Sequence, residues 1–298
     1  MLSSEQKNWR LHPESIFRTT AHKYFTIPEP LFTISCPEED TNYLRAISIC
    51  LNSYISDYYN FFKSTQWGVD RNSIFIQDIR TIAVPALSTN QIVEISKLQQ
   101  EPYMSEIGTV AQERLDKEIG RILNIPRNIS IIAKDFINVR CTLNKNKAII
   151  ATQPSAEHHL LEYGECLARE LDEFVEGSGT RHKISIVNSN SFTICTVEIA
   201  KSSSPIDITV TIVTNNNNYY YLLGNIQQEP RYKFNQWVYT QCGIYIFDGA
   251  KIHICKASRL IDWTQTQALN DSDDIIAQVL TTKNQNNEAL LEGSGITN

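Results

Sequence analysis

Most of the short motifs that identify an enzyme are missing from this 298-residue chain. It has no G-x-x-x-x-G-K-[ST] phosphate loop, no G-x-G-x-x-G turn, no G-x-S-x-G elbow and no H-E-x-x-H zinc motif. A nuclease would need an acidic residue followed by E-x-K, and the one E-x-K run, Glu5-Gln6-Lys7, falls in an expected tail. We therefore expect no nuclease or NTPase activity and no bound cofactor.

Long apolar runs are also missing, and proline and glycine are few. No stretch approaches the ~20 apolar residues that cross a bilayer, and the first 15 residues contain no apolar signal core. The seven cysteines are scattered, odd in number and form no C-x-x-C pair. This usage predicts free thiols in a reducing compartment, so we expect a cytoplasmic protein with no membrane partner.

Periodic apolar residues predict an N-terminal half that is largely helical after two short strands. The spacing predicts one helix from about residue 40 to Lys63, and a second that Ser88 caps. A third is expected over about 105–123. The inward residues of the last two helices are predicted to be Ile92, Ile95, Leu98, Val110, Leu115, Ile119 and Ile122.

The C-terminal half mixes strands with one long helix. Residues 128–143 and 147–152 are rich in isoleucine and predict strands, as do 182–188, 191–200 and 206–214. A helix is predicted over Ser155–Glu176, capped by Ser155, with Leu160, Leu167, Leu171 and Phe174 buried. Asp248-Gly249 predicts a hairpin with a type I′ turn between two alternating strands. The fold class predicted is therefore α+β, with an antiparallel-sheet domain packed on this helix.

The titratable residues form no convincing metal or acid–base site. His158 and His159 are adjacent on a helix and point about 100° apart, so they cannot chelate together. His253 and Cys255, with Cys242 upstream, lack a fourth ligand and give only a weak zinc signal. The glutamates of residues 157–176 fit the solvated face of an amphipathic helix. We expect no catalytic residues and no metal site.

One stretch resembles a known family. "YLRAISICLNSYISDYYNFF" and "GVDRNSIFIQDIRTIAVPALSTNQ" (43–62 and 68–91) resemble the target-recognition region of bacterial adenine-N6 DNA methyltransferases and of restriction–modification specificity subunits. The likeness covers about residues 22–100 and depends on a helix with an "LLNS"-like turn, here Leu51-Asn52-Ser53. A variable loop follows, then an "I..IPIP.L…Q" segment that includes Pro85, Leu87 and Gln91. Segments of the second half are similar to the far C-terminus of some bacterial methylases.

This resemblance implies a recognition part without a catalytic part. An adenine methyltransferase needs a [DNS]-P-P-[YFW] motif to hold the flipped base, and this chain contains no Pro-Pro pair. The implied organisation is a target-recognition-like α/β domain (1–102), a connecting helix (103–126) and a C-terminal α+β domain (127–298). The implied function is a non-catalytic DNA-recognition subunit of a modification, restriction or anti-phage defence complex. Its partners would be DNA and a separate methyltransferase or other subunit.

Residues 64–73 form the polar loop expected to read DNA. Arg71 can address guanine, Asn72 or Gln66 adenine, and Trp67 can stack or act as a wedge. The candidate DNA-binding residues are Lys63, Gln66, Trp67, Arg71 and Asn72. In the alternative reading of this loop, Trp67 is core and Arg71 is an ordinary surface charge beside Asp70. The aromatic run before the loop is expected to be core: Tyr54, Tyr58, Tyr59, Phe61 and Phe62.

Two other functions stay open at this point. The net charge of −6 is unusual for a stand-alone DNA-binding protein and favours a protein-binding scaffold or sensor in a defence assembly, without base readout. The third hypothesis is an enzyme whose site is assembled from scattered residues.

Overall fold

A computed structural model of the chain describes residues 36–63, 81–82, 84–99, 109–145, 148–189, 192–201, 208–212 and 243–293. These residues fall into two compact units, 1–146 and 147–298. The sequence placed a connecting helix at 103–126 and began the second domain at 127. In the structure, the division follows Asn146, so the helices after residue 109 belong to the first unit as far as that point.

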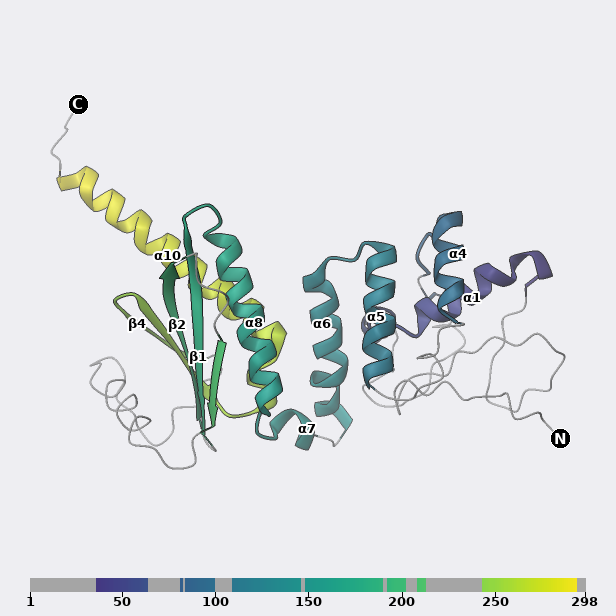
Figure 1. The fold of residues 1–298 in the computed structure, drawn as a ribbon, viewed down its shortest axis with the longest axis horizontal. Helices are drawn as coiled ribbons and strands as arrows, with labels where there is room; N and C mark the ends of the chain where they lie inside the picture. Colours follow the sequence, from purple (N-terminus) through teal and green to yellow (C-terminus); the bar gives the residue numbers. More distant parts are fainter. Residues whose placement is uncertain are drawn as a thin grey trace. The chain divides into compact units, whose positions relative to one another are not determined.

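Every regular element that the structure describes in the first unit is a helix (Figure 1). They form η1 (Glu38–Asp40), α1 (Thr41–Leu51), α2 (Tyr54–Lys63), α4 (Thr89–Leu98), α5 (Thr109–Leu123), α6 (Arg127–Asn138) and η3 (Arg140–Lys145). The single helix predicted from residue 40 to Lys63 is therefore wrong in one respect. It is interrupted at Asn52 and Ser53, which separate α1 from α2.

Helices α1, α4 and α5 enclose the main core of the first unit. Ala46, Ile95 and Leu115 are fully buried there, and Leu87 packs against the same cluster. The predicted inward residues of α4 and α5 are confirmed for Ile95, Leu98, Leu115, Ile119 and Ile122, with Ile92 packed against the cluster. The prediction for Val110 is wrong, because this residue lies in the first turn of α5 and is exposed.

Residues 127–145 and 148–152 are helical and not extended, which corrects the strand prediction for 128–143 and for the described part of 147–152. α6 and η3 cover the first of these stretches, and α7 (Ala148–Thr152) covers most of the second. Isoleucine-rich sequences favour strands when only local propensity is considered, but tertiary packing decides the outcome. Here Phe136 of α6 packs edge-on against Tyr58 and Phe61 of α2, a contact that depends on the helical conformation of both segments.

The second unit is a five-stranded sheet with helices. Its strands are β1 (Thr180–Asn188), β2 (Phe192–Lys201), β3 (Ile208–Ile212), β4 (Ile244–Asp248) and β5 (Lys251–Ala257). Their order is β3-β1-β2-β5-β4. All neighbours are antiparallel except β1 and β3, which are parallel. The predicted α+β class is confirmed, whereas the sheet is mixed and not wholly antiparallel. β5 occupies the free edge of β2, so β3 pairs with β1.

Two long helices, α8 (Glu157–Phe174) and α10 (Gln265–Gly293), pack with the sheet (Figure 1). Gly164 of α8 lies so close to β1 and β3 that a Cβ atom there would be 3.0 Å from the Ile208 side chain and 3.4 Å from that of Ile184. The register places Cys195 of β2 and Ile254 of β5 on the same face as Ile186. This face of the sheet and α8 form the buried interior of the second unit.

The long helix and the hairpin were predicted from sequence, with two errors in detail. Leu160, Leu167 and Leu171 are buried as predicted, but Phe174 ends the helix and is 44% exposed. Ser155 does not cap α8, since the N-cap position is Ala156 and has no side-chain cap. In the hairpin, Gly249 and Ala250 are the two turn residues, and Gly249 has a φ of 57°. Glycine at the first central position with positive φ is typical of a type II′ turn, where type I′ was expected.

Among the described helices, none has the combination of length and apolarity that a membrane span requires.

Candidate nucleic-acid interface

The break between α1 and α2 is a compact turn that ends one helix and starts the next. The Ser53 hydroxyl donates to the Cys50 carbonyl (2.6 Å) and accepts from the Ser56 amide (3.3 Å). It therefore satisfies a carbonyl at the end of α1 and a free N–H group at the start of α2. Ser53 belongs to the Leu51-Asn52-Ser53 motif, on which the family resemblance depends. This motif therefore has a structural role in this chain.

Helix α5 holds this turn through two polar side chains. Gln112 donates from Nε2 to the Asn52 carbonyl (2.8 Å) and to Oδ2 of Asp116 (2.6 Å). The other carboxylate oxygen of Asp116 accepts the Tyr54 amide (2.7 Å), which is the first N–H of α2. A carboxylate at a helix N-terminus complements the helix dipole. The position and direction of α2 are therefore fixed by α5.

The carboxyl group of Asp116 is in an apolar setting that opposes its ionisation. Burial raises its pKa to about 7, although the hydrogen bonds from Gln112 and from the Tyr54 amide favour the charged form. The nearby Asp57 raises this pKa further, and Lys134 of α6 opposes that effect. The phenol of Tyr54 is also buried, and burial raises its pKa well above the ordinary value.

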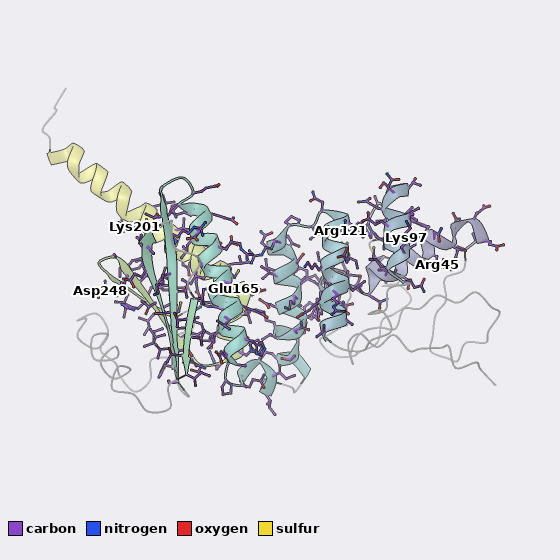
Figure 2. All side chains as sticks on the ribbon, viewed as in Figure 1. Arg45, Lys97, Arg121, Glu165, Lys201 and Asp248 are labelled. Carbon is purple, nitrogen blue, oxygen red and sulfur yellow. The ribbon has the colours of Figure 1, made fainter. Side chains whose placement is uncertain are left out.

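Helix α4 is fixed to the other end of α5. Ser88 and Gln91 form a capping box at its start, in which the Ser88 hydroxyl accepts the Gln91 amide and the Gln91 side chain accepts the Ser88 amide. The Nε2 group of Gln91 also donates to the Ile122 carbonyl in the last turn of α5 (3.0 Å). Arg121, labelled near the end of α5 in Figure 2, forms an ion pair with Glu94 of α4 (2.6 Å). The cap that was predicted at Ser88 is confirmed.

The last turn of α2 carries an exposed group of aromatic and basic side chains. Phe62 is 62% exposed and Tyr59 is 38% exposed, and Lys63 is exposed beside them. The ammonium group of Lys63 lies 5.8 Å from the centre of the Tyr59 ring, within the range of a cation–π contact. We call these three residues, Tyr59, Phe62 and Lys63, the α2 corner.

Of the predicted DNA-binding residues, the structure places only Lys63, at the end of α2. Gln66, Trp67, Arg71 and Asn72 lie outside the described residues, as does the whole stretch 64–80. Tyr59 and Phe62 were treated as core when only the sequence was considered. Their exposure fits the burial of Asp57, which lies on the opposite side of the helix from both rings.

The second unit contains a buried polar network that sequence reasoning missed. The carboxylate of Asp271 on α10 accepts hydrogen bonds from Tyr163 of α8 (2.5 Å) and Tyr245 of β4 (2.5 Å), and it forms an ion pair with Lys256 of β5. Burial raises the pKa of both tyrosines, and the Asp271 charge adds to this effect. The side chains of Lys256 and Asp271 are 7% and 3% exposed, so this network joins four elements inside the unit.

Further contacts fix the Lys256 side chain. Its ammonium group lies 5.6 Å from the centre of the Trp263 ring and 5.7 Å from that of Tyr163. Gly243 has a φ of 60°, and a Cβ atom there would be 3.0 Å from the Lys256 side chain. One sequence signal could have revealed this site, because Ile252, Ile254 and Lys256 alternate along β5 and so share its buried face. With its donors and acceptors engaged, this network is suited to holding the elements together.

The weak zinc signal on β5 has a different explanation in the structure. Nδ1 of His253 is hydrogen-bonded to the Thr196 hydroxyl (2.9 Å), and Cys255 packs with Ile194 and Ile244. Cys242 lies outside the described residues. Within the part of the chain that the structure describes, no three His, Cys, Asp or Glu side chains gather as metal ligands would.

No protein family, no curated protein and no solved structure matches this chain. The functional argument therefore depends on the residues and geometry described above.

Proposed function

We propose that this protein is a non-catalytic DNA-recognition subunit of a bacterial DNA-modification, restriction or anti-phage defence complex. It would act with a separate methyltransferase or another subunit that supplies the chemistry. The proposal begins with the resemblance of residues 22–100 to target-recognition regions, and the observation that carries it comes from the first unit.

That observation is the fixing of both flanks of residues 64–80 to one helix. α2 ends at Lys63, before this stretch, and its start is hydrogen-bonded to Asp116 of α5. α4 begins at Thr89, after it, and Gln91 binds the Ile122 carbonyl of the same helix. Reading base edges requires a few side chains held in a fixed register relative to the duplex. The attachment of both flanking helices, α2 and α4, to the same helix supports a fixed placement of the segment between them.

The distribution of charge removes an objection to DNA binding. Residues 1–146 contain 16 Lys and Arg and 16 Asp and Glu, and residues 147–298 contain 11 and 17, so the net charge of −6 belongs entirely to the second unit. The first unit is neutral and does not repel phosphate as a whole. Most of the affinity for phosphate would still come from the partner, because non-specific binding depends on a basic excess.

The test is a competition between cognate and scrambled duplexes with the partner subunit present. Arg71→Ala should weaken discrimination by ~1–3 kcal/mol at one base position, as the loss of one bidentate contact does. Trp67→Ala should also weaken sequence-specific binding, through the loss of stacking. Circular dichroism should show unchanged folding. The proposal fails if both variants keep full discrimination, or if Trp67→Ala unfolds the protein because the ring belongs to the core.

A separate measurement tests the non-catalytic part of the proposal. The sequence offers no glycine-bearing strand–turn–helix for S-adenosylmethionine, so calorimetry on the purified chain should detect no binding. Saturable micromolar binding of this compound would contradict a role in recognition alone.

A protein-binding scaffold or sensor is the second candidate, and the second unit favours it. This unit carries the whole acidic excess, and Val279 and Leu280 of α10 are exposed. A salt series separates the two functions, since DNA binding weakens steeply as salt rises through counterion release. A complex with the partner that persists in high salt and shows no dependence on DNA would favour the scaffold.

A further inference from the structure

The α2 corner is built as a rigid support for an exposed ring. Phe62 is the most exposed of the aromatic side chains that the structure describes, at 62%. Its inner edge nonetheless contacts other rings, with centroid distances of 5.0, 5.3 and 5.4 Å. These rings belong to Tyr58, Phe61 and Phe136. The ring is therefore fixed from below while its outer face stays open to solvent.

The rings beneath Phe62 are themselves anchored between two helices. Phe136 of α6 packs at 4.7 Å from Phe61 and at 5.1 Å from Tyr58, in edge-to-face geometry. Aromatic pairs in this geometry contribute beyond the burial of their area. An ordinary exposed phenylalanine would leave water-exposed apolar surface without such support. This arrangement suits a surface that receives a flat ligand.

We infer that the α2 corner stacks a nucleobase that has left its base pair, with Lys63 binding the adjoining phosphate. This inference depends on the proposed function and adds to it the form of nucleic acid that the chain contacts, a locally single-stranded one. Proteins that bind single strands combine aromatic faces for the bases with cations for the backbone. Lys63 beside Tyr59 and Phe62 offers both groups within one helical turn.

The chemistry of the corner favours a nucleotide over an apolar protein segment. A purely apolar partner would need no cation beside the rings. A base and its phosphate, in contrast, match a ring and an ammonium group that are separated by one helical turn. Tyr59 and Lys63 are four residues apart, so they lie on the same side of α2 as Phe62. If the partner of the α2 corner is a protein and not a nucleic acid, the test below should show no saturable binding of single-stranded DNA.

The experiment uses the full chain and a fluorescein-labelled 12-nucleotide single-stranded DNA, followed by anisotropy at low salt. Wild type should bind saturably, and Phe62→Ala should weaken binding at least about fivefold, whereas Phe62→Trp should retain it. Lys63→Gln should reduce the slope of log affinity against log salt by about 0.7. The control is Tyr43→Ala, which removes an aromatic ring that is 42% exposed at the start of α1 and should change nothing.

Each outcome decides the inference. No saturable binding by wild type, or equal binding by Phe62→Ala and wild type with unchanged circular dichroism, overturns it. If Phe62→Ala and Tyr43→Ala weaken binding equally, the contact is non-specific and the inference also fails. The result is distinguishable from failure of the proposed function, because this probe has no cognate sequence. If Arg71→Ala abolishes discrimination between duplexes while Phe62→Ala binds the single-stranded probe as well as wild type, base reading is left intact and only the stacking surface is removed.

Discussion

The two units use buried polar side chains in different ways. In the first unit, Gln112, Asp116 and Gln91 bind the backbone at the ends of neighbouring helices. In the second, Lys256 and Asp271 bind each other, with tyrosines completing the set. Backbone contacts fix where a helix starts and in which direction it runs. Side-chain contacts between elements lock a packed interior. The first arrangement positions α2 and α4, and the second stabilises the interior of its unit.

The two units also differ in net charge and in the side chains that they expose. The first unit is neutral and exposes Tyr59, Phe62 and Lys63 together, while the second carries the entire acidic excess. If this comparison is correct, variants in the buried network of the second unit should change its stability strongly. Variants in the helix-end contacts of the first unit should change its stability less and should mainly affect the placement of α2 and α4.

The largest effect is expected for Asp271→Ala. It leaves the Lys256 charge buried without its partner, which typically costs ~3–5 kcal/mol. Hydrogen exchange in a urea series should show this loss in peptides of the second unit. The matched control is Lys251→Ala, which breaks the ion pair between Lys251 of β5, the strand that also carries Lys256, and Glu198 of β2. Both of its side chains are nearly half exposed, so the cost should stay below about 1 kcal/mol. Equal costs at the two sites would remove the distinction between the units.

Leu167→Ala should have the next largest effect. Leu167 is fully buried on α8, and truncation of such a leucine costs ~2–5 kcal/mol. Phe174→Ala removes a larger side chain from the same helix, but this residue is 44% exposed, and the loss should be smaller than at Leu167. The measurement is again the urea dependence of hydrogen exchange in the second unit. A cost below about half a kilocalorie per mole at Leu167 would mean that the buried face of α8 is misassigned.

Leu167 and Phe174 also show how much of α8 could be predicted from the sequence. Heptad-like spacing predicted the buried stripe of α8, since a helix that packs on a sheet must be amphipathic. It failed at Phe174, because the pattern does not tell where the sheet stops supporting the helix. It failed more widely over residues 128–143, where isoleucines favour strands but contacts between Phe136 and α2 favour a helix.

The polar contacts were harder to predict than the elements. Ser88 and Gln91 are three residues apart and form a recognisable capping box, so this cap was found from sequence. Asp116 and the Tyr54 amide are 62 positions apart, and Tyr163 and Asp271 are 108 apart. No local spacing connects such partners. The exposed rings of the α2 corner were missed for another reason. An aromatic-rich helix end favours a core position when only the sequence is considered.

A pH series tests the polar contacts of the first unit. Asp116 has a pKa near 7 when folded against an ordinary value of 3.8, so the folded state retains a proton that the unfolded chain releases. Its stabilisation is complete below pH 3.8 and is lost as pH rises through about 7. Each pH unit between 5 and about 7 corresponds to about 1.4 kcal/mol, so the first unit should be more stable at pH 5 than at pH 8 by at most about 3 kcal/mol.

The Asp116→Asn variant should remove most of this dependence while keeping an acceptor for the Tyr54 amide. The readout is hydrogen exchange of peptides from α2 and α5 in urea at the two pH values. Glu113→Gln is the control. The half-exposed carboxylate of Glu113 pairs with Lys134, which belongs to α6 and not to the turn between α1 and α2, so this variant should keep the pH dependence. Identical pH profiles for Asp116→Asn and wild type would show that the carboxyl group of Asp116 does not set this behaviour.

The smallest effect compares one substitution at two serines that sequence reasoning treated as equivalent helix caps. Ser88 accepts the Gln91 amide at the start of α4, so Ser88→Ala should cost about 1 kcal/mol and loosen α4. Ser155 is 4% exposed, and its hydroxyl oxygen has no hydrogen-bond partner among the described residues. Removing an unsatisfied buried hydroxyl relieves a desolvation cost, so Ser155→Ala should be neutral or stabilising by up to about 1 kcal/mol. A loss of stability in Ser88→Ala together with a gain in Ser155→Ala would support the view that the first unit relies on contacts at helix ends. A comparable loss at Ser155 would mean that its hydroxyl does bind a partner, and that the second unit also relies on contacts of this kind.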